Sequence, residues 1–314
     1  MVGIGDDAAV IRGEKRAHQV LTTDALVESV HFDRRFSTPA DIGYKALAVN
    51  VSDVAAMGAT PHVALLSLML PADTPIDDVD GLLDGLFEMA RAVNVTLVGG
   101  NITRSPGPLI VDVTLTGWVH PRKMLTRSAG RPGDALYVSG SIGGAAAGLS
   151  WLQAHGHRPN DNDDDVPGDP ILADCVRRHV RPEPQARLGM VVGRNRAASA
   201  CMDLSDGLAD AVRQLAQASG TGAKLDLSAL PVHPGATAWF ASIGVDAVAR
   251  SLAGGDDYEL LMAVPGRTKG RFRNASRLAR GVEVTRIGEL TGTPELTIVS
   301  EGGGRPLPDG FVHF

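Results

Sequence analysis

Residues 41–59 read DIGYKALAVNVSDVAAMGA, and the organisation of the chain is best worked out from this stretch. Apolar residues recur in it at helical spacing, namely Tyr44, Leu47, Ala48, Val51 and Ala55. This period predicts an amphipathic helix that ends near Gly58. Asp53 lies on a different stripe, with Asn50 and Met57, because residues three and four apart share one helix face. The pattern therefore allows Asp53 to point at something other than the core.

The segments around this helix predict a layer of mixed strands and helices. Strands are expected at 3–11, 19–23, 62–70, 96–98 and 109–119, and a second amphipathic helix at 76–93. Residues 13–16 should form the turn between the first two strands, and Gly99 with Gly100 should end the strand at 96–98. The first 120 residues thus have the mixture of elements that an α+β layer requires.

The second part of the chain shows the same succession of strand, helix and strand. A boundary is expected within 121–130, because Pro132, Gly133 and Asp134 then precede a new strand. Helices are expected at 143–154, 208–219 and 245–252, and strands at 223–227 and 258–264. We therefore predict an α+β fold of two domains, 1–125 and 126–314.

Composition describes an ordinary soluble globular protein. The chain has 314 residues, 44% hydrophobic residues and a net charge of −6. It has no basic block for a nucleic-acid phosphate backbone and no apolar run of the roughly 20 residues that cross a bilayer, so neither nucleic acid nor membrane is expected as a partner. Two cysteines, Cys175 and Cys201, are too few for a disulfide scaffold and are typical of a cytoplasmic protein.

Four acidic turns could carry the chemistry: GDD at 5–7, TTD at 22–24, SD at 52–53 and DLSDG at 203–207. Each places a carboxylate at the edge of a strand or helix. Magnesium takes oxygen ligands and usually binds one or two carboxylates together with phosphate oxygens and water. A single Asp is more often a helix cap or turn residue, so the spacing alone leaves their convergence open.

Other functional patterns are weaker. The acidic stretch 160–170 lacks the glycine and glutamate of an EF-hand loop, which favours a solvated insertion over a calcium site. The chain contains no GxxxxGK[ST], no GxGxxG after a first strand and no HExxH. His31 is one of nine histidines, and a lone histidine is more often structural than a ligand contact.

The order of the motifs resembles the thiamine-monophosphate kinase family. The resemblance rests on GIGDDAAV, LTTDALVESVHF, YKALAVNVSDVAAMGA, LTRSAGRPGD, DLSDG and AGGDDYELL, and it runs from Gly3 to Phe314. The family belongs to an ATP-dependent superfamily that includes aminoimidazole ribonucleotide synthetase, selenophosphate synthetase and a hydrogenase maturation protein. Its members usually carry a helix before the Gly-Asp-Asp turn, so an N-terminal segment is expected to be missing here.

The resemblance implies a homodimer whose N-terminal domains pair into a central barrel, with ATP and substrate between the domains. It implies magnesium ligands at Asp7, Thr22, Thr23, Asp24, Asp53, Asn101, Asp203 and Asp206. It also implies ATP contacts at Gly100, Asn101, Arg127 and Ser205, and substrate contacts at His31, Asp256 and Phe311. The implied reaction transfers the γ-phosphoryl group of ATP to thiamine monophosphate, several magnesium ions assisting.

Two positions depart from the family pattern. The usual GGDT reads GGNI, so Asn101 replaces a metal-binding aspartate, and its amide oxygen brings no negative charge. Metal affinity should fall there unless Asp112 or a water compensates. The usual GGED reads GGDD, so Asp256 is one methylene shorter and could reach the substrate through a bridging water.

The expected mechanism needs no protein nucleophile, because phosphoryl transfer mainly requires positioning and neutralisation of charge. A phosphate oxygen is already largely ionised at pH 7. One alternative function is that of another member of the superfamily, which acts on a different acceptor. A second is a non-catalytic protein that binds a nucleotide or thiamine phosphate, and Asn101 is the reason to consider it. A structural protein with fortuitous acidic turns would show no magnesium-dependent binding at all.

Overall fold

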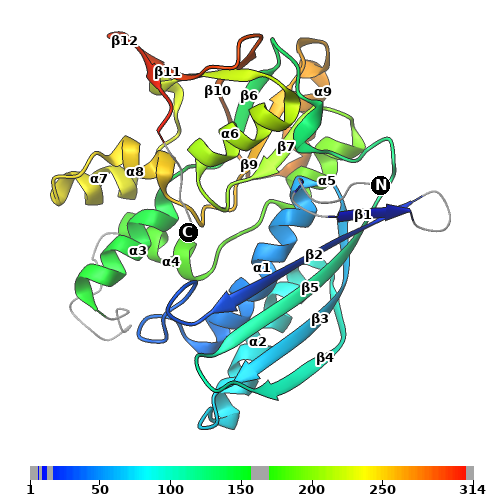
Figure 1. Cartoon of the computed structure of the whole chain (residues 1–314), viewed down its shortest axis with the longest axis vertical. Coiled ribbons are helices and arrows are strands. Elements are labelled where there is room, and N and C mark those ends of the chain that lie inside the picture. The colour runs from blue at the N-terminus through cyan, green and yellow to red at the C-terminus, as the bar shows by residue number, and fades with distance from the viewer. Residues whose placement is uncertain (1–5, 7–8, 13–16, 157–169, 309–314) are drawn as a thin grey trace.

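The computed structural model describes residues 6, 9–12, 17–156 and 170–308. The N-terminal part contains a five-stranded sheet in the order β1-β2-β5-β3-β4. Its strands are β1 (Ala9–Arg12), β2 (His18–Val27), β3 (Thr60–Leu70), β4 (Thr96–Arg104) and β5 (Ile110–Val119). Only β3 and β4 run parallel to each other; the other neighbours are antiparallel. Helices α1 (Pro39–Ala56) and α2 (Ile76–Val93) pack against each other on one face of the sheet (Figure 1).

The helix of the opening stretch is central, and its predicted amphipathic character was wrong. Asn50 and Met57, expected to share a stripe with Asp53 away from the core residues, are fully buried, whereas Tyr44 and Asp53 are only half-buried. The reason is that α1 contacts β2 and β5 on one side and helix α5 (Ala186–Arg194) and strand β7 (Ala200–Asp203) on another. A helix enclosed between two layers needs small and apolar residues around its whole circumference.

The glycine pair in β4 is part of a strand and not the predicted turn. Gly100 pairs with Leu66 of β3, and a Cβ atom at Gly100 would lie 1.9 Å from the Leu66 carbonyl oxygen. The register of β3 and β4 shifts between Ala64 and Leu65, which marks an irregularity next to the glycines. Glycine within a strand often marks such a close backbone approach.

The C-terminal part is built on a seven-stranded mixed sheet in the order β12-β11-β8-β10-β6-β9-β7. The strands besides β7 are β6 (Ala135–Ser139), β8 (Gly222–Asp226), β9 (Leu260–Val264), β10 (Val284–Thr291), β11 (Leu296–Ser300) and β12 (Gly303–Pro306). The helices besides α5 are α3 (Gly144–His155), α4 (Pro170–Val180), α6 (Leu208–Ser219), α7 (Pro234–Ser242), α8 (Ala247–Ala253) and α9 (Lys269–Ala279). The α+β fold of two such layers is therefore confirmed.

The two layers meet closely at α1. A Cβ atom at Gly189 of α5 would lie 2.0 Å from the carbonyl oxygen of Ala55, so the two helix backbones touch there. This contact brings the C-terminal half of α1 beside β7. Within the described ranges, no helix is both long enough and apolar enough to span a bilayer.

Candidate functional site

Three of the acidic turns meet on the side of the first sheet that faces α1. Thr22 of β2 donates a hydrogen bond to the Asp53 carboxylate, and the Asp24 side chain hydrogen-bonds with the same carboxylate. One residue earlier on α1, Ser52 donates a 2.7 Å hydrogen bond to Oδ2 of Asp203, at the end of β7. The site thus combines a strand and helix of the first layer with a strand of the second.

Several carboxylates gather at this point. Burial raises the pKa of Asp24 above its ordinary value, and the hydrogen bond between Asp24 and Asp53 opposes this rise. The negative charges of Asp112 and Asp206 raise the pKa of Asp24 further. Close carboxylates repel one another, and a bound cation relieves the repulsion. The donors are all oxygens, which suits a hard cation such as Mg²⁺.

The oxygen donors do not form a closed cage. In the parts of the chain that the structure describes, no group of three His, Cys, Asp or Glu residues could hold a metal ion by itself. Asp7, an expected ligand, lies outside the described residues. An open arrangement is compatible with Mg²⁺, which keeps several water ligands and completes its shell with substrate phosphates.

Two of the expected metal ligands have side chains on the opposite face of the sheet. Thr23 lies 2.9 Å from Oδ1 of Asp112 and 3.0 Å from the Thr114 hydroxyl. Asn101 is in register with Ser67, which is in register with Asp112. Directly paired residues of adjacent strands project to one face, so Thr23, Asp112 and Asn101 share the face on which no described helix packs. Successive side chains of a strand point to opposite faces of the sheet. Thr23 therefore points away from the face that its neighbours Thr22 and Asp24 share.

The DLSDG turn lies next to the expected substrate residue Asp256. The backbone N–H of Asp256 donates a 2.8 Å hydrogen bond to the Ser205 carbonyl, and the N–H of Tyr258 donates one of 3.0 Å to Leu204. Asp206 follows in the same turn and helix α6 begins at Leu208, so the metal and substrate candidates are adjacent. Asp256 has a φ of +68°, a left-handed conformation that non-glycine residues rarely adopt.

Lys45 is a site residue that the sequence did not reveal. Its ammonium lies 2.9 Å from Oδ2 of Asp256 and 3.2 Å from the carbonyl oxygen of His31, and its side chain is only 3% exposed. It therefore joins two of the three expected substrate contacts, His31 and Asp256. No signal in the sequence distinguishes it, because one lysine in an apolar helix is normally assumed to reach solvent.

Two further groups surround the Asp256 carboxylate. His179 Nδ1 lies 3.4 Å from Oδ2, and the Tyr258 hydroxyl donates a 3.1 Å hydrogen bond to Oδ1. Burial would raise the pKa of Asp256, but Lys45 and His179 outweigh burial and hold it far below the ordinary value. Asp256 is therefore an ionised acceptor held in place from several sides.

The remaining expected contacts are placed as follows. The ring of His31 accepts a 3.1 Å hydrogen bond at Nδ1 from the Val27 N–H. Arg127 donates from its backbone to Asp6 at 2.7 Å and from its side chain to Gln214 at 2.5 Å. Gly100 lies in β4, beside Asn101. Phe311 lies outside the described residues.

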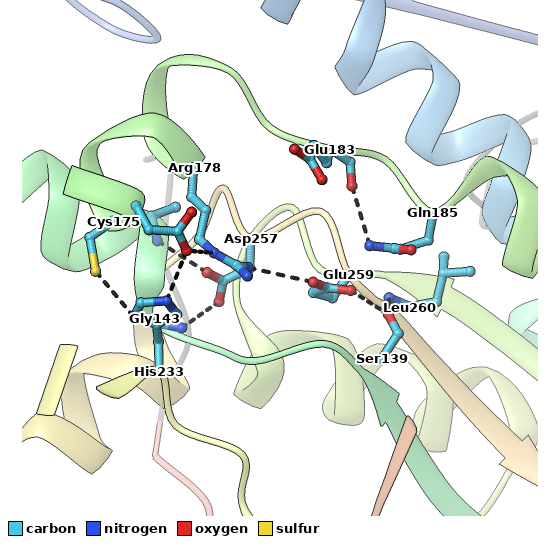
Figure 2. Close-up of polar contacts among 12 residues, drawn as sticks. Ser139, Gly143, Cys175, Arg178, Glu183, Gln185, His233, Asp257, Glu259 and Leu260 are labelled. Atoms are coloured by element: carbon cyan, nitrogen blue, oxygen red, sulfur yellow. Dashed lines mark hydrogen bonds and ion pairs between the residues drawn. The ribbon is translucent and has the colours of Figure 1, made fainter. Parts of the chain in front are cut away.

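Two further buried carboxylates, Asp257 and Glu259, lie just before strand β9 (Figure 2). Asp257 accepts hydrogen bonds from the backbone of Gly143 at 2.7 Å and Ala145 at 3.3 Å, at the start of α3. Burial raises the pKa of Asp257 to about 7, and these amides oppose the rise. Burial likewise raises the pKa of Glu259 to about 7, against the effects of its hydrogen bond from Ser139 and of Arg178.

The variant Glu259→Gln should lose part of the pH dependence of stability. In the folded protein Glu259 retains its proton up to about pH 7, whereas its ordinary pKa is 4.5. The folded state therefore binds more protons between these values, so its stability falls as pH rises through this window. The wild type should lose about 3 kcal/mol more than Glu259→Gln between pH 4.5 and 8. Chemical denaturation across this pH range measures the free energy of unfolding. Glu283→Gln is the control, because Glu283 is an exposed carboxylate. Parallel pH curves for wild type and Glu259→Gln would contradict the assignment.

Comparison with known proteins covers both layers. The model for the AIR synthase related protein N-terminal domain matches residues 5–119, and the model for the C-terminal domain matches residues 131–301. The thiamine-monophosphate kinase of Escherichia coli strain K12 is 36% identical over 315 residues, which are 100% of this chain and 92% of that protein. The thiamine-monophosphate kinase of Corynebacterium glutamicum is 37% identical, over 99% of this chain and 88% of that protein.

Solved structures agree with the sequence relatives. The structure described as AaThiL complexed with AMPPCP and TMP superposes with a TM-score of 0.85 at 31% identity, covering 99% of this chain and 92% of that chain. The thiamine-monophosphate kinase from Stenotrophomonas maltophilia K279a has a TM-score of 0.81 at 33% identity, covering 95% and 90%. The chain therefore belongs to the AIR synthase related family and, within it, to the thiamine-monophosphate kinases.

Proposed function

We propose that this chain phosphorylates thiamine monophosphate to thiamine diphosphate, with ATP as the phosphoryl donor. The observation that carries the proposal is the meeting of three separate elements: Asp24 lies beside Asp53 of α1, and the neighbouring Ser52 contacts Asp203 of β7. It is supported by full-length relatives named thiamine-monophosphate kinase and by a neighbour that holds AMPPCP, an ATP analogue, together with TMP.

Asp24, Asp53, Asp203 and Asp206, with the Thr22 hydroxyl, would hold magnesium on the α1 side of the sheet. When bound, magnesium would neutralise phosphate oxygens of both anionic substrates. The chain itself contributes fixed geometry: Thr22 orients the Asp53 carboxylate and Ser52 orients that of Asp203. Such positioning is most of what phosphoryl transfer asks of a protein. Asp7 remains a proposed ligand. Thr23 and Asn101 share the opposite face of the sheet with Asp112, so their oxygens would belong to a different one of the several proposed magnesium ions.

The nucleotide and acceptor are proposed to bind around this carboxylate centre. Gly100, Asn101, Arg127 and Ser205 are the proposed ATP contacts. His31, Asp256 and Phe311 are the proposed contacts of the acceptor. Ser205 and Asp256 are joined by a backbone hydrogen bond, which supports neighbouring nucleotide and acceptor sites. Lys45 limits the freedom of Asp256, so a bridging water would still be needed for a distant acceptor atom.

Phosphorus NMR of the purified protein with ATP, magnesium and thiamine monophosphate tests the proposal. The expected result is the paired resonances of thiamine diphosphate, formed only when magnesium is present and not when thiamine replaces its monophosphate. ATP binding without any diphosphate would instead support a non-catalytic binder or a different acceptor, and would overturn the proposed reaction.

The variant Asn101→Asp should lower the magnesium concentration for half-maximal activity about threefold to tenfold, because it adds a negative charge to an oxygen ligand. Initial rates over a magnesium titration measure this. Thr103→Asp is the matched control, since Thr103 lies two residues along the same strand and therefore on the same face. An unchanged magnesium requirement in Asn101→Asp would remove this residue from the proposed ligands.

We further propose a homodimer formed through the helix-free face of the first sheet. Exposed apolar residues lie on that face or along its edge strand: Leu65 at 47%, Val98 at 57% and Trp118 at 36% exposure. Strand β4 also leaves one edge of the sheet unpaired among the described strands. Large exposed apolar surface commonly marks an interface.

The domain boundary between residues 125 and 126 and a cytoplasmic location of the protein are likewise proposals.

The variant Leu65→Glu should shift this dimer to monomer, because it replaces an exposed apolar residue of the proposed interface with a charged one. Sedimentation velocity measures the change in mass. Leu278→Glu, at a 56% exposed position on α9, should leave the dimer intact. A wild-type monomer at micromolar concentration, or a dimeric Leu65→Glu, would refute this interface.

A further inference from the structure

A pocket of about 310 Å³ lies where the segment linking the two sheets meets the second layer. Basic side chains dominate its lining: Arg122, Lys123, Arg196, Arg267 and Arg271. They come from the linking segment, the residues after α5, and the region where α9 begins. We name this set the cationic pocket. Its described lining contains no aspartate and no glutamate.

Among the described residues, no carboxylate forms an ion pair with the basic side chains of the cationic pocket. Arg177, Arg178 and Arg181, in contrast, each contact carboxylates. The Asp134 carboxylate accepts a 2.6 Å hydrogen bond from the lining residue Ser199, but Asp134 is only 5% exposed and does not line the pocket. Five like charges around one hollow repel one another, and an anion relieves that repulsion.

The walls of the pocket are fixed by close packing. Leu125 of the linking segment donates a 3.1 Å backbone hydrogen bond to Met57, at the end of α1. A Cβ atom at Gly193 would lie 2.7 Å from the Lys123 carbonyl oxygen, so the segment lies directly on the end of α5. The Thr268 hydroxyl contacts the Ala197 carbonyl at 2.8 Å and does not cap the first turn of α9. That turn therefore adds its positive dipole end to the region.

We propose that the cationic pocket binds a small anion with two or more phosphate groups. Arginine guanidinium groups contact phosphate oxygens through paired, charge-assisted hydrogen bonds, and a diphosphate offers enough oxygens for several of them. The hollow is concave and small, and a net charge of −6 disfavours long polyanions. The pocket is separate from the carboxylate site, because Ser199 precedes β7 and Asp203 ends it. Binding here requires no metal.

Calorimetric titration of the full-length protein with inorganic pyrophosphate tests the pocket. EDTA is present and magnesium absent, so that metal-dependent binding at the carboxylate site does not contribute. We expect saturable binding that weakens as salt is raised, because the exposed charges are screened. The double variant Arg267→Ala/Arg271→Ala should bind at least roughly tenfold more weakly, since each lost charged hydrogen bond costs about that factor.

The matched control is Arg273→Ala, on α9 but outside the pocket lining. It should bind pyrophosphate like the wild type, and so should Asp53→Asn, which separates this site from the proposed catalytic one. Parallel titrations with ADP and with thiamine diphosphate distinguish a nucleotide from the reaction product as the source of the diphosphate group. No binding at millimolar pyrophosphate, or equal binding by the double variant and Arg273→Ala, would overturn the proposal.

Discussion

Replacing Asp53 with asparagine is expected to lower kcat by roughly a hundredfold to ten-thousandfold, because several kcal/mol of charge stabilisation in the transition state depend on the metal it would hold. The Asp53 carboxylate accepts from Thr22 and hydrogen-bonds with Asp24, so it is the shared member of the cluster. Asparagine keeps the shape and one acceptor oxygen but removes the charge. Asp53→Ala, which removes both, should abolish transfer.

The effect of both Asp53 variants is measured as the initial rate of ADP release, and the phosphorus NMR spectrum identifies the product. Thermal unfolding should show that both variants remain folded, since Asp53 is only half-buried. Asp77→Asn, on the first turn of α2, removes an exposed carboxylate and should leave kcat unchanged. An Asp53→Ala enzyme that retained wild-type kcat would contradict the metal assignment.

Replacing Lys45 with methionine is expected to affect stability and substrate binding together. The variant leaves the Asp256 carboxylate without its 2.9 Å ammonium partner. Removing one member of a buried ion pair typically costs 3–5 kcal/mol, and the 31% exposure of Asp256 lowers the expected loss to about 2–4 kcal/mol. His31 also loses the ammonium that contacts its carbonyl oxygen. We therefore expect the KM for thiamine monophosphate to rise about tenfold.

Denaturant unfolding and steady-state kinetics in both substrates measure the two effects of Lys45→Met. The KM for ATP should change much less, because the polar contacts of Lys45 within the described residues are with the proposed acceptor residues His31 and Asp256. Lys269→Met, at an exposed position of α9, is the control for loss of a lysine charge. Equal increases in both KM values would show a general structural effect and would contradict the positioning role of Lys45.

The order of motifs in the sequence was enough to assign the family and the reaction. Hydrophobic period alone predicted helix 76–93 and helix 208–219 at the bounds of α2 and α6. These elements are local: each has one apolar face, and the side chains that define it lie within a few turns of one another. The carboxylates of TTD, SD and DLSDG could also be named, because acidic residues at element edges stand out from their surroundings.

Tertiary structure decided what those residues touch. The enclosure of α1 between the two layers, the strand conformation of Gly100, and the placement of Asn101 on the opposite face from Asp53 depend on which elements become neighbours. The same holds for Lys45 and Asp256, which are 211 positions apart in the chain. A periodic pattern reports which side of an element is apolar, but not what covers that side. Contacts between distant segments are set by packing of the whole chain, so only the folded structure could reveal the buried lysine and the cationic pocket.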